Sequence, residues 1–126
     1  MNLTNIQKIA DDIKTITIQG ATNIAKAACQ VMEQELRGQT FSSPEELKDF
    51  VFTATEILIK ARETEPLLRN GMKYAKSKLN AGSSQLEIAD AFAEYYSRVV
   101  REEECRPLIG ADLINDGENI VTHCHS

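Results

Sequence analysis

The sequence predicts an all-α protein, an N-terminal bundle of about five helices, and three observations support this. Along most of the 126-residue chain, apolar residues recur at intervals of three and four, the spacing of one helix face. Two Ser-x-x-Glu sequences, Ser43–Glu46 and Ser84–Glu87, have the pattern of a capping box at a helix start. Glycine, proline or polar residues separate the periodic segments.

The first two helices are expected over residues 3–16 and from Thr22 to about residue 36. Gly20 lies between them and gives the backbone the freedom to turn. Gly38 is expected to close the second helix. The apolar face of the first helix contains five residues: Leu3, Ile6, Ile9, Ile13 and Ile16.

A third helix is expected to start at Ser43, because Pro44 suits the first helical position and Glu46 can complete the capping box. Pro66 interrupts the pattern after residue 65. A fourth helix is then expected over residues 67–79, and Asn80-Ala81-Gly82 ends it.

The fifth helix is expected to open at Ser84 and to continue, with a possible bend at Pro107, to Asp116-Gly117. Leu86 is among the residues predicted on its apolar side. Residues 119–124 are rich in β-branched side chains and predict a short strand. Because a lone strand has no partner in a helical domain, we expect residues 1–117 to form the bundle and residues 118–126 to begin a sheet-containing domain.

Composition argues against several classes of function. Lys and Arg number 14 against 19 Asp and Glu, a net charge of -5, whereas a nucleic-acid coat needs clustered positive charge. No apolar run approaches the roughly 20 residues that span a bilayer, and the polar, acidic N-terminal region is not typical of a secretory signal. Three cysteines are too few for a disulfide scaffold. We therefore expect a cytoplasmic protein with neither a membrane nor a direct nucleic-acid partner.

Cysteine and histidine residues are the candidates for reactive or metal-binding groups. Cys29 lies in an apolar run and is expected in the core, and Cys105 lies among acidic residues on the surface. In a strand, Cys124 would face away from His123 and His125, so no metal or cofactor is expected. A cysteine between a strand and the next helix is a better candidate for thiolate chemistry.

Two features could bind an anion. The turn at Gly20 leads into a helix whose first amides are free to bind one. Arg69, Lys73 and Lys76 form one helical stripe in an acidic protein, which could hold a phosphorylated ligand. The stripe is interpreted more readily as a solvated helix face.

Four stretches, taken together, resemble the translation initiation factor 2B alpha/beta/delta family, which includes ribose-1,5-bisphosphate isomerase and methylthioribose-1-phosphate isomerase. Residues 16–21, ITIQGA, are similar to its I-x-G-A turn, and residues 61–70, ARETEPLLRN, to its A-R-P-T…N segment. Residues 110–114, GADLI, precede an acidic-glycine turn, and residues 120–126, IVTHCHS, are similar to the signature I-x-T-H-C-N-S.

The resemblance implies an N-terminal helical domain that precedes a Rossmann-like domain, of which residues 118–126 would be the first strand. It implies that Cys124 is the catalytic thiol and that Ser126 starts a phosphate-binding turn. It further implies that Arg62 and the residues Gln19, Gly20, Ala21 and Thr22 contact the substrate phosphate. Gln19 stands where the isomerases have arginine, and Glu63 stands where they have proline.

Two functions follow from the resemblance. In the first, the intact protein is a homo-oligomer that isomerises a sugar 1-phosphate, ribose 1,5-bisphosphate to ribulose 1,5-bisphosphate, and this chain alone is inactive because the partner aspartate is missing. In the second, the chain is a non-catalytic interaction module that binds a translation factor through its helical surface.

Overall fold

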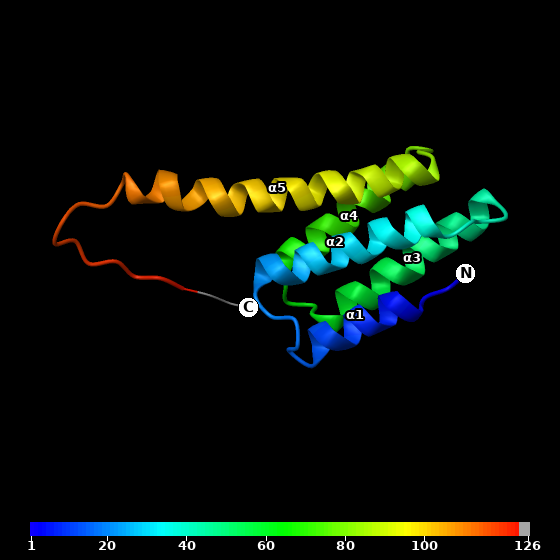
Figure 1. Ribbon diagram of the computed structural model, residues 1–126, viewed down its shortest axis with the longest axis horizontal. Helices are drawn as coiled ribbons and strands as arrows, with labels where there is room; N and C mark the ends of the chain where they lie inside the picture. The colour runs from blue at the N-terminus through cyan, green and yellow to red at the C-terminus, as the bar shows by residue number, and fades with distance from the viewer. Residues whose placement is uncertain (124–126) are drawn as a thin grey trace.

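The computed structural model describes residues 1–123 and contains five α-helices in this part of the chain (Figure 1). This confirms the predicted all-α bundle. The helices are α1 (Thr4–Lys14), α2 (Ala21–Gly38), α3 (Pro44–Ala61), α4 (Pro66–Asn80) and α5 (Gln85–Ala111). Within residues 1–123, no helix is both long enough and apolar enough to cross a membrane.

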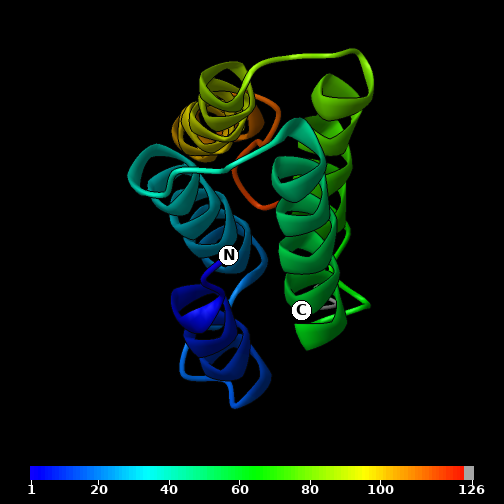
Figure 2. The same cartoon turned by 90° about the vertical axis from the view of Figure 1, so that its right-hand side faces the viewer.

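Successive helices run in opposite directions, so that their connections alternate between the two ends of the bundle (Figures 1 and 2). The α1–α2 and α3–α4 connections therefore lie at one end, and the α2–α3 and α4–α5 connections lie at the other with the N-terminus. Helix α2 is central, since it packs against α1, α4 and α5. Helix α5 runs back to the end that contains the α1–α2 and α3–α4 connections and extends beyond the other helices there (Figure 1).

Apolar side chains from all five helices form one continuous core. Burial of each large aliphatic or aromatic side chain contributes about 1.5–3 kcal/mol. The largest fully buried apolar residues are Phe50, Phe92, Ile6, Ile13, Ile24, Met32, Leu36, Leu58, Leu68, Met72 and Ile88.

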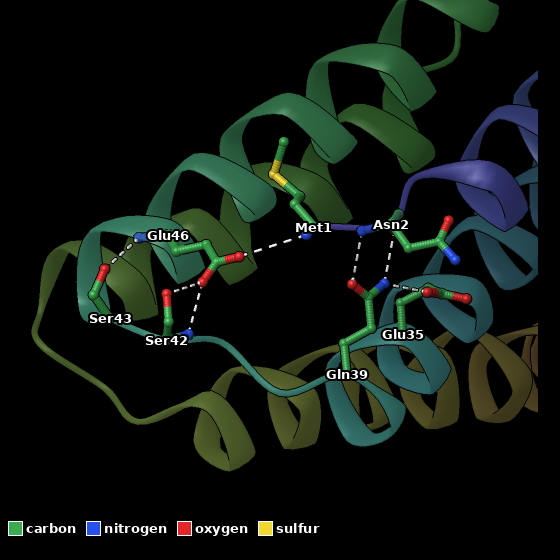
Figure 3. Close-up of polar contacts among 7 residues, drawn as sticks. All are labelled: Met1, Asn2, Glu35, Gln39, Ser42, Ser43 and Glu46. Carbon is green, nitrogen blue, oxygen red and sulfur yellow. Dashed lines mark hydrogen bonds and ion pairs between the residues drawn. The ribbon is translucent and has the colours of Figure 1, made fainter.

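The two predicted capping boxes differ in the structure. At α5 the box is complete, because the Glu87 N–H donates to Ser84 Oγ and the Ser84 N–H donates to Glu87 Oε2. At α3 the Glu46 N–H donates to Ser43 Oγ at 3.1 Å, but the Glu46 carboxylate accepts from the N–H and hydroxyl of Ser42 (Figure 3). The prediction that the Glu46 carboxylate accepts from the N–H of the cap residue Ser43 is therefore wrong, because the donor is the preceding residue, Ser42.

The N-terminal residues are tied to the end of α2 and the start of α3 (Figure 3). The N–H of Asn2 donates to Gln39 Oε1 at 2.9 Å, and Gln39 Nε2 donates back to the Asn2 carbonyl at 2.7 Å. The amino group of Met1 lies 3.5 Å from Glu46 Oε1. These contacts fix the end of the bundle opposite the α1–α2 turn.

Several details differ from the prediction. Helix α5 ends at Ala111, before the predicted limit at Asp116-Gly117. Helix α1 ends at Lys14, and Ile16 adopts a left-handed φ of 64° with its side chain exposed, so it does not extend the apolar face. Leu86 is also exposed, because it lies on the first turn of α5 away from the core. The predicted strand is not formed over residues 119–123, since the all-helical described chain offers no strand to pair with.

Candidate phosphate-binding end

The turn before α2 is built around Gly20. This residue is the N-cap of α2 and has φ 88° and ψ 134°, a conformation that favours glycine. The side-chain amide of Asn23 donates to the Gln19 carbonyl at 3.2 Å and holds the turn closed. Gln19 and Gly20 are exposed, while Ala21 and Thr22 are half-buried.

The start of α2 has the electrostatic character that suits an anion. The N–H groups of Ala21, Thr22 and Asn23 precede the first intrahelical bond, from Ile24 N–H to Gly20 C=O, and so have no partner in the helix. The first turn of α2 contains no acidic residue of its own. The helix dipole adds partial positive charge at the same place.

Arg62 is the C-cap residue of α3 and begins the α3–α4 turn. Its N–H donates to the Ile59 carbonyl, and its carbonyl accepts from the Glu65 N–H at 3.1 Å. Its side chain is half-buried, and its guanidinium forms no hydrogen bond or ion pair within residues 1–123. The main chain of this turn is thus fixed while the cationic group remains available.

The alternating helix directions place the Gly20 turn and Arg62 at the same end of the bundle (Figures 1 and 2). Helix α5 carries the chain past this end, and the following residues turn back toward it (Figure 1). Cys124 and Ser126 lie outside the described residues, so their predicted roles remain predictions.

A carboxylate from α5 also reaches the start of α2. Glu103 Oε1 accepts from Thr22 Oγ1 at 2.8 Å, and Glu103 Oε2 accepts from Lys26 Nζ at 2.8 Å. Both bonds lower the pKa of Glu103, and the bond from Lys26 has the larger effect. Sequence reasoning missed this contact, because the partners are about 80 positions apart and no local pattern links them.

The α3–α4 turn contains a second feature that the sequence did not reveal. Glu65 is 1% exposed, and neither of its carboxylate oxygens has a hydrogen-bond partner within residues 1–123. Although it is the N-cap residue of α4, its side chain makes no capping bond. A buried acid without a partner is costly, so this turn carries an internal stability penalty.

The predicted basic stripe is largely occupied by contacts within the chain. Arg69 Nη1 donates to the Glu63 carbonyl at 2.9 Å and closes the α3–α4 turn. Lys76 Nζ lies 3.0 Å from Glu56 Oε1 and 5.0 Å from the centre of the Phe52 ring. Lys73 is exposed. The stripe therefore fits a structural helix face better than a phosphate site.

The two described cysteines have the surroundings that the sequence predicts. Cys29 is buried, and its desolvation raises the pKa of the thiol to about 12. Cys105 is exposed and lies in α5 after Val99, the last buried residue of that helix. Neither thiol lies in the Gly20 turn or the α3–α4 turn.

Comparison with known proteins identifies related sequences over nearly the whole chain. The model of the initiation factor 2 subunit family matches residues 17–126. The ribose 1,5-bisphosphate isomerase of Methanocaldococcus jannaschii is 31% identical over 96% of this chain, and that of Pyrococcus furiosus is 29% identical over 100%. A putative methylthioribose-1-phosphate isomerase of Archaeoglobus fulgidus is 26% identical over 97% of it.

The matched region is only part of each relative. It covers 39% of the Methanocaldococcus protein, 41% of the Pyrococcus protein and 37% of the Archaeoglobus protein. No solved structure matches the chain.

Proposed function

The chain belongs to the initiation factor 2 subunit family, and from that premise we propose that it is the helical part of a sugar-phosphate isomerase. The proposed reaction converts ribose 1,5-bisphosphate to ribulose 1,5-bisphosphate. The names of the relatives in Methanocaldococcus and Pyrococcus support this substrate.

One observation carries the proposal. The Gly20 turn and Arg62 lie at the same end of the bundle (Figures 1 and 2). The amides at the start of α2 and the Arg62 guanidinium, which has no partner within residues 1–123, can bind an anion there. A phosphate group has the charge and the acceptor oxygens that such donors favour. Binding it through Thr22 as well requires the Thr22 hydroxyl to leave Glu103, since that carboxylate now accepts its hydrogen bond.

The chemistry places further demands on the intact protein. Opening the sugar ring and moving a proton between adjacent carbons requires an acid and a base in contact with the substrate. We propose that Cys124 supplies one of these groups and that the second comes from outside residues 1–126. The helical part then binds and orients the phosphorylated substrate, and this chain alone gives no turnover.

The alternative, an interaction module that binds a translation factor through the basic stripe, has weaker support. Arg69 and Lys76 are engaged by the Glu63 carbonyl and by Glu56. Only Lys73 of the three projects as an exposed cation within the described chain.

The test is an isomerase assay of the protein expressed from its complete reading frame. We expect formation of ribulose 1,5-bisphosphate from ribose 1,5-bisphosphate, and loss of this activity in Cys124→Ser. Activity on methylthioribose 1-phosphate alone would show that this sugar phosphate, and not ribose 1,5-bisphosphate, is the substrate. Activity on neither sugar, or turnover by residues 1–126 alone, would contradict the proposal.

A further inference from the structure

Helix α5 has two parts with different surroundings. Residues up to Val99 pack on the bundle, and Val99 is the last buried residue of the helix. Each of the residues 101–109 is exposed to solvent, although the helix continues to Ala111. We call residues 101–111 the overhang, and Figure 1 shows the C-terminal end of α5 extending past the other helices.

The overhang has an intrinsic weak point. Pro107 lies inside α5 and has no N–H, so the carbonyl four residues earlier, that of Glu103, loses its helical partner. A short helical segment without tertiary packing has little stability of its own in water. The direction of the overhang therefore depends on any contact that holds it near this break.

Glu103 makes that contact. Its two carboxylate oxygens accept separate hydrogen bonds, from Thr22 Oγ1 and from Lys26 Nζ, both at 2.8 Å. The Lys26 side chain is 22% exposed and that of Glu103 is 41% exposed, so the pair is partly shielded from water. Two bonds to one helix restrain a carboxylate more than a single flexible ion pair does.

The other charged side chains of the overhang make no equivalent contact. Arg101, Glu102, Glu104 and Arg106 are exposed and form no hydrogen bond or ion pair within residues 1–123. In the described chain, Glu103 is thus the only overhang side chain with a polar bond to the bundle, and it lies one turn before the Pro107 break.

We propose that Glu103 is a positioning residue, whose bonds to Thr22 and Lys26 fix the overhang of α5 relative to the Gly20 turn. This inference rests on the proposed function, in which the chain beyond α5 supplies the catalytic thiol to the same end of the bundle. Without the contact, the last residue that anchors α5 to the bundle is Val99 rather than Glu103, so a longer part of the helix is free to change direction.

The experiment measures the distance between the bundle and the overhang by pulsed electron paramagnetic resonance. Spin labels are attached to Gln30→Cys on α2 and to Arg106→Cys, which precedes Pro107 in the overhang, and both positions are exposed. Cys105→Ser and Cys124→Ser remove the competing thiols, and buried Cys29 is retained. We expect a single narrow distance distribution, and loss of that peak in Glu103→Ala.

Two further variants make the result specific. Glu104→Ala removes a neighbouring exposed acid and should leave the distribution unchanged. We expect the single variants Lys26→Glu and Glu103→Lys each to lose the narrow peak, and the double variant that combines them to restore it. If the substitutions acted only by weakening the helix, the double variant would not recover the peak. Circular dichroism of each variant checks that the bundle remains folded.

The outcomes separate this inference from the proposed function. An unchanged distribution in Glu103→Ala, or no recovery in the exchanged pair, overturns the positioning role whatever the protein catalyses. The distance measurement requires neither substrate nor turnover, so a narrow peak that depends on Glu103 stands even if the isomerase assay fails.

Discussion

Gly71 of α4 and Tyr95 of α5 are in such close contact that a β-carbon added to Gly71 would lie 2.8 Å from Cε1 of the Tyr95 ring. The Tyr95 hydroxyl donates to the Leu67 carbonyl at 3.0 Å, in the first turn of α4. The pair therefore fixes the start of α4, and with it the turn that contains Arg62, against α5.

We expect Gly71→Ala to destabilise the protein by about 1 kcal/mol. Overpacking against the Tyr95 ring costs about 1–3 kcal/mol, and the better helix propensity of alanine offsets about 1 kcal/mol of it. Urea unfolding measures the change. Gly38→Ala is the matched control, because an added β-carbon there meets nothing within 4 Å, and equal destabilisation of both variants would contradict the close contact.

Replacing the buried acid Glu65 should stabilise the protein. Glu65→Met keeps the length of the side chain and removes two oxygens that have no partner within the described residues, so we expect a gain of about 1–3 kcal/mol. Glu63→Met, at an exposed position in the same turn, should change the free energy of unfolding by less than about 0.5 kcal/mol. A loss of stability in Glu65→Met would mean that the carboxylate has a favourable partner.

The contact of Glu103 should respond to pH in a defined direction. Hydrogen bonds from Lys26 and Thr22 lower the pKa of Glu103 from its ordinary value of 4.5. The contact is therefore fully formed above this value and is lost as the pH falls through the lowered pKa. In a carbon-13 NMR titration, Lys26→Met should move the pKa of Glu103 up toward 4.5, and an unchanged pKa would exclude Lys26 as the main cause.

The cysteines should differ in their reactivity toward iodoacetamide. Burial raises the pKa of Cys29 to about 12, so its thiolate is scarce at pH 8 and the side chain is shielded. In the Cys124→Ser variant we expect alkylation of Cys105 alone in the native protein, and of both cysteines in urea. Mass spectrometry of the peptides identifies the sites, and native alkylation of Cys29 would show that α2 opens locally.

Local sequence signals predicted the helices well because each has a short-range cause. Ser43 with Pro44 and Ser84 with Glu87 determine the starts of α3 and α5 through bonds within four residues. The exposed Ile16 and Leu86 were misassigned, because periodicity gives the side of a helix but not where its buried part stops. Residues 119–123 form no strand in the described chain, and the predicted strand stays a prediction because its formation depends on a partner strand.

The candidate site was predicted only in part. The Gly20 turn and Arg62 belong to motifs that are readable along the chain, and the alternation of helices brings them to one end. The Glu103 contact with Thr22 and Lys26, and the burial of Glu65, arise from the packing of distant segments and have no local signal.

The most direct test of the central claim is to titrate the nitrogen-15-labelled chain with ribose 1,5-bisphosphate and follow its amide resonances. We predict shifts concentrated at Gly20–Asn23 that are lost in Arg62→Gln and retained in Lys73→Gln. Shifts that survive Arg62→Gln but disappear in Lys73→Gln would place the phosphate on the basic stripe. That result, or no shift at the start of α2, would contradict a phosphate site at this end of the bundle.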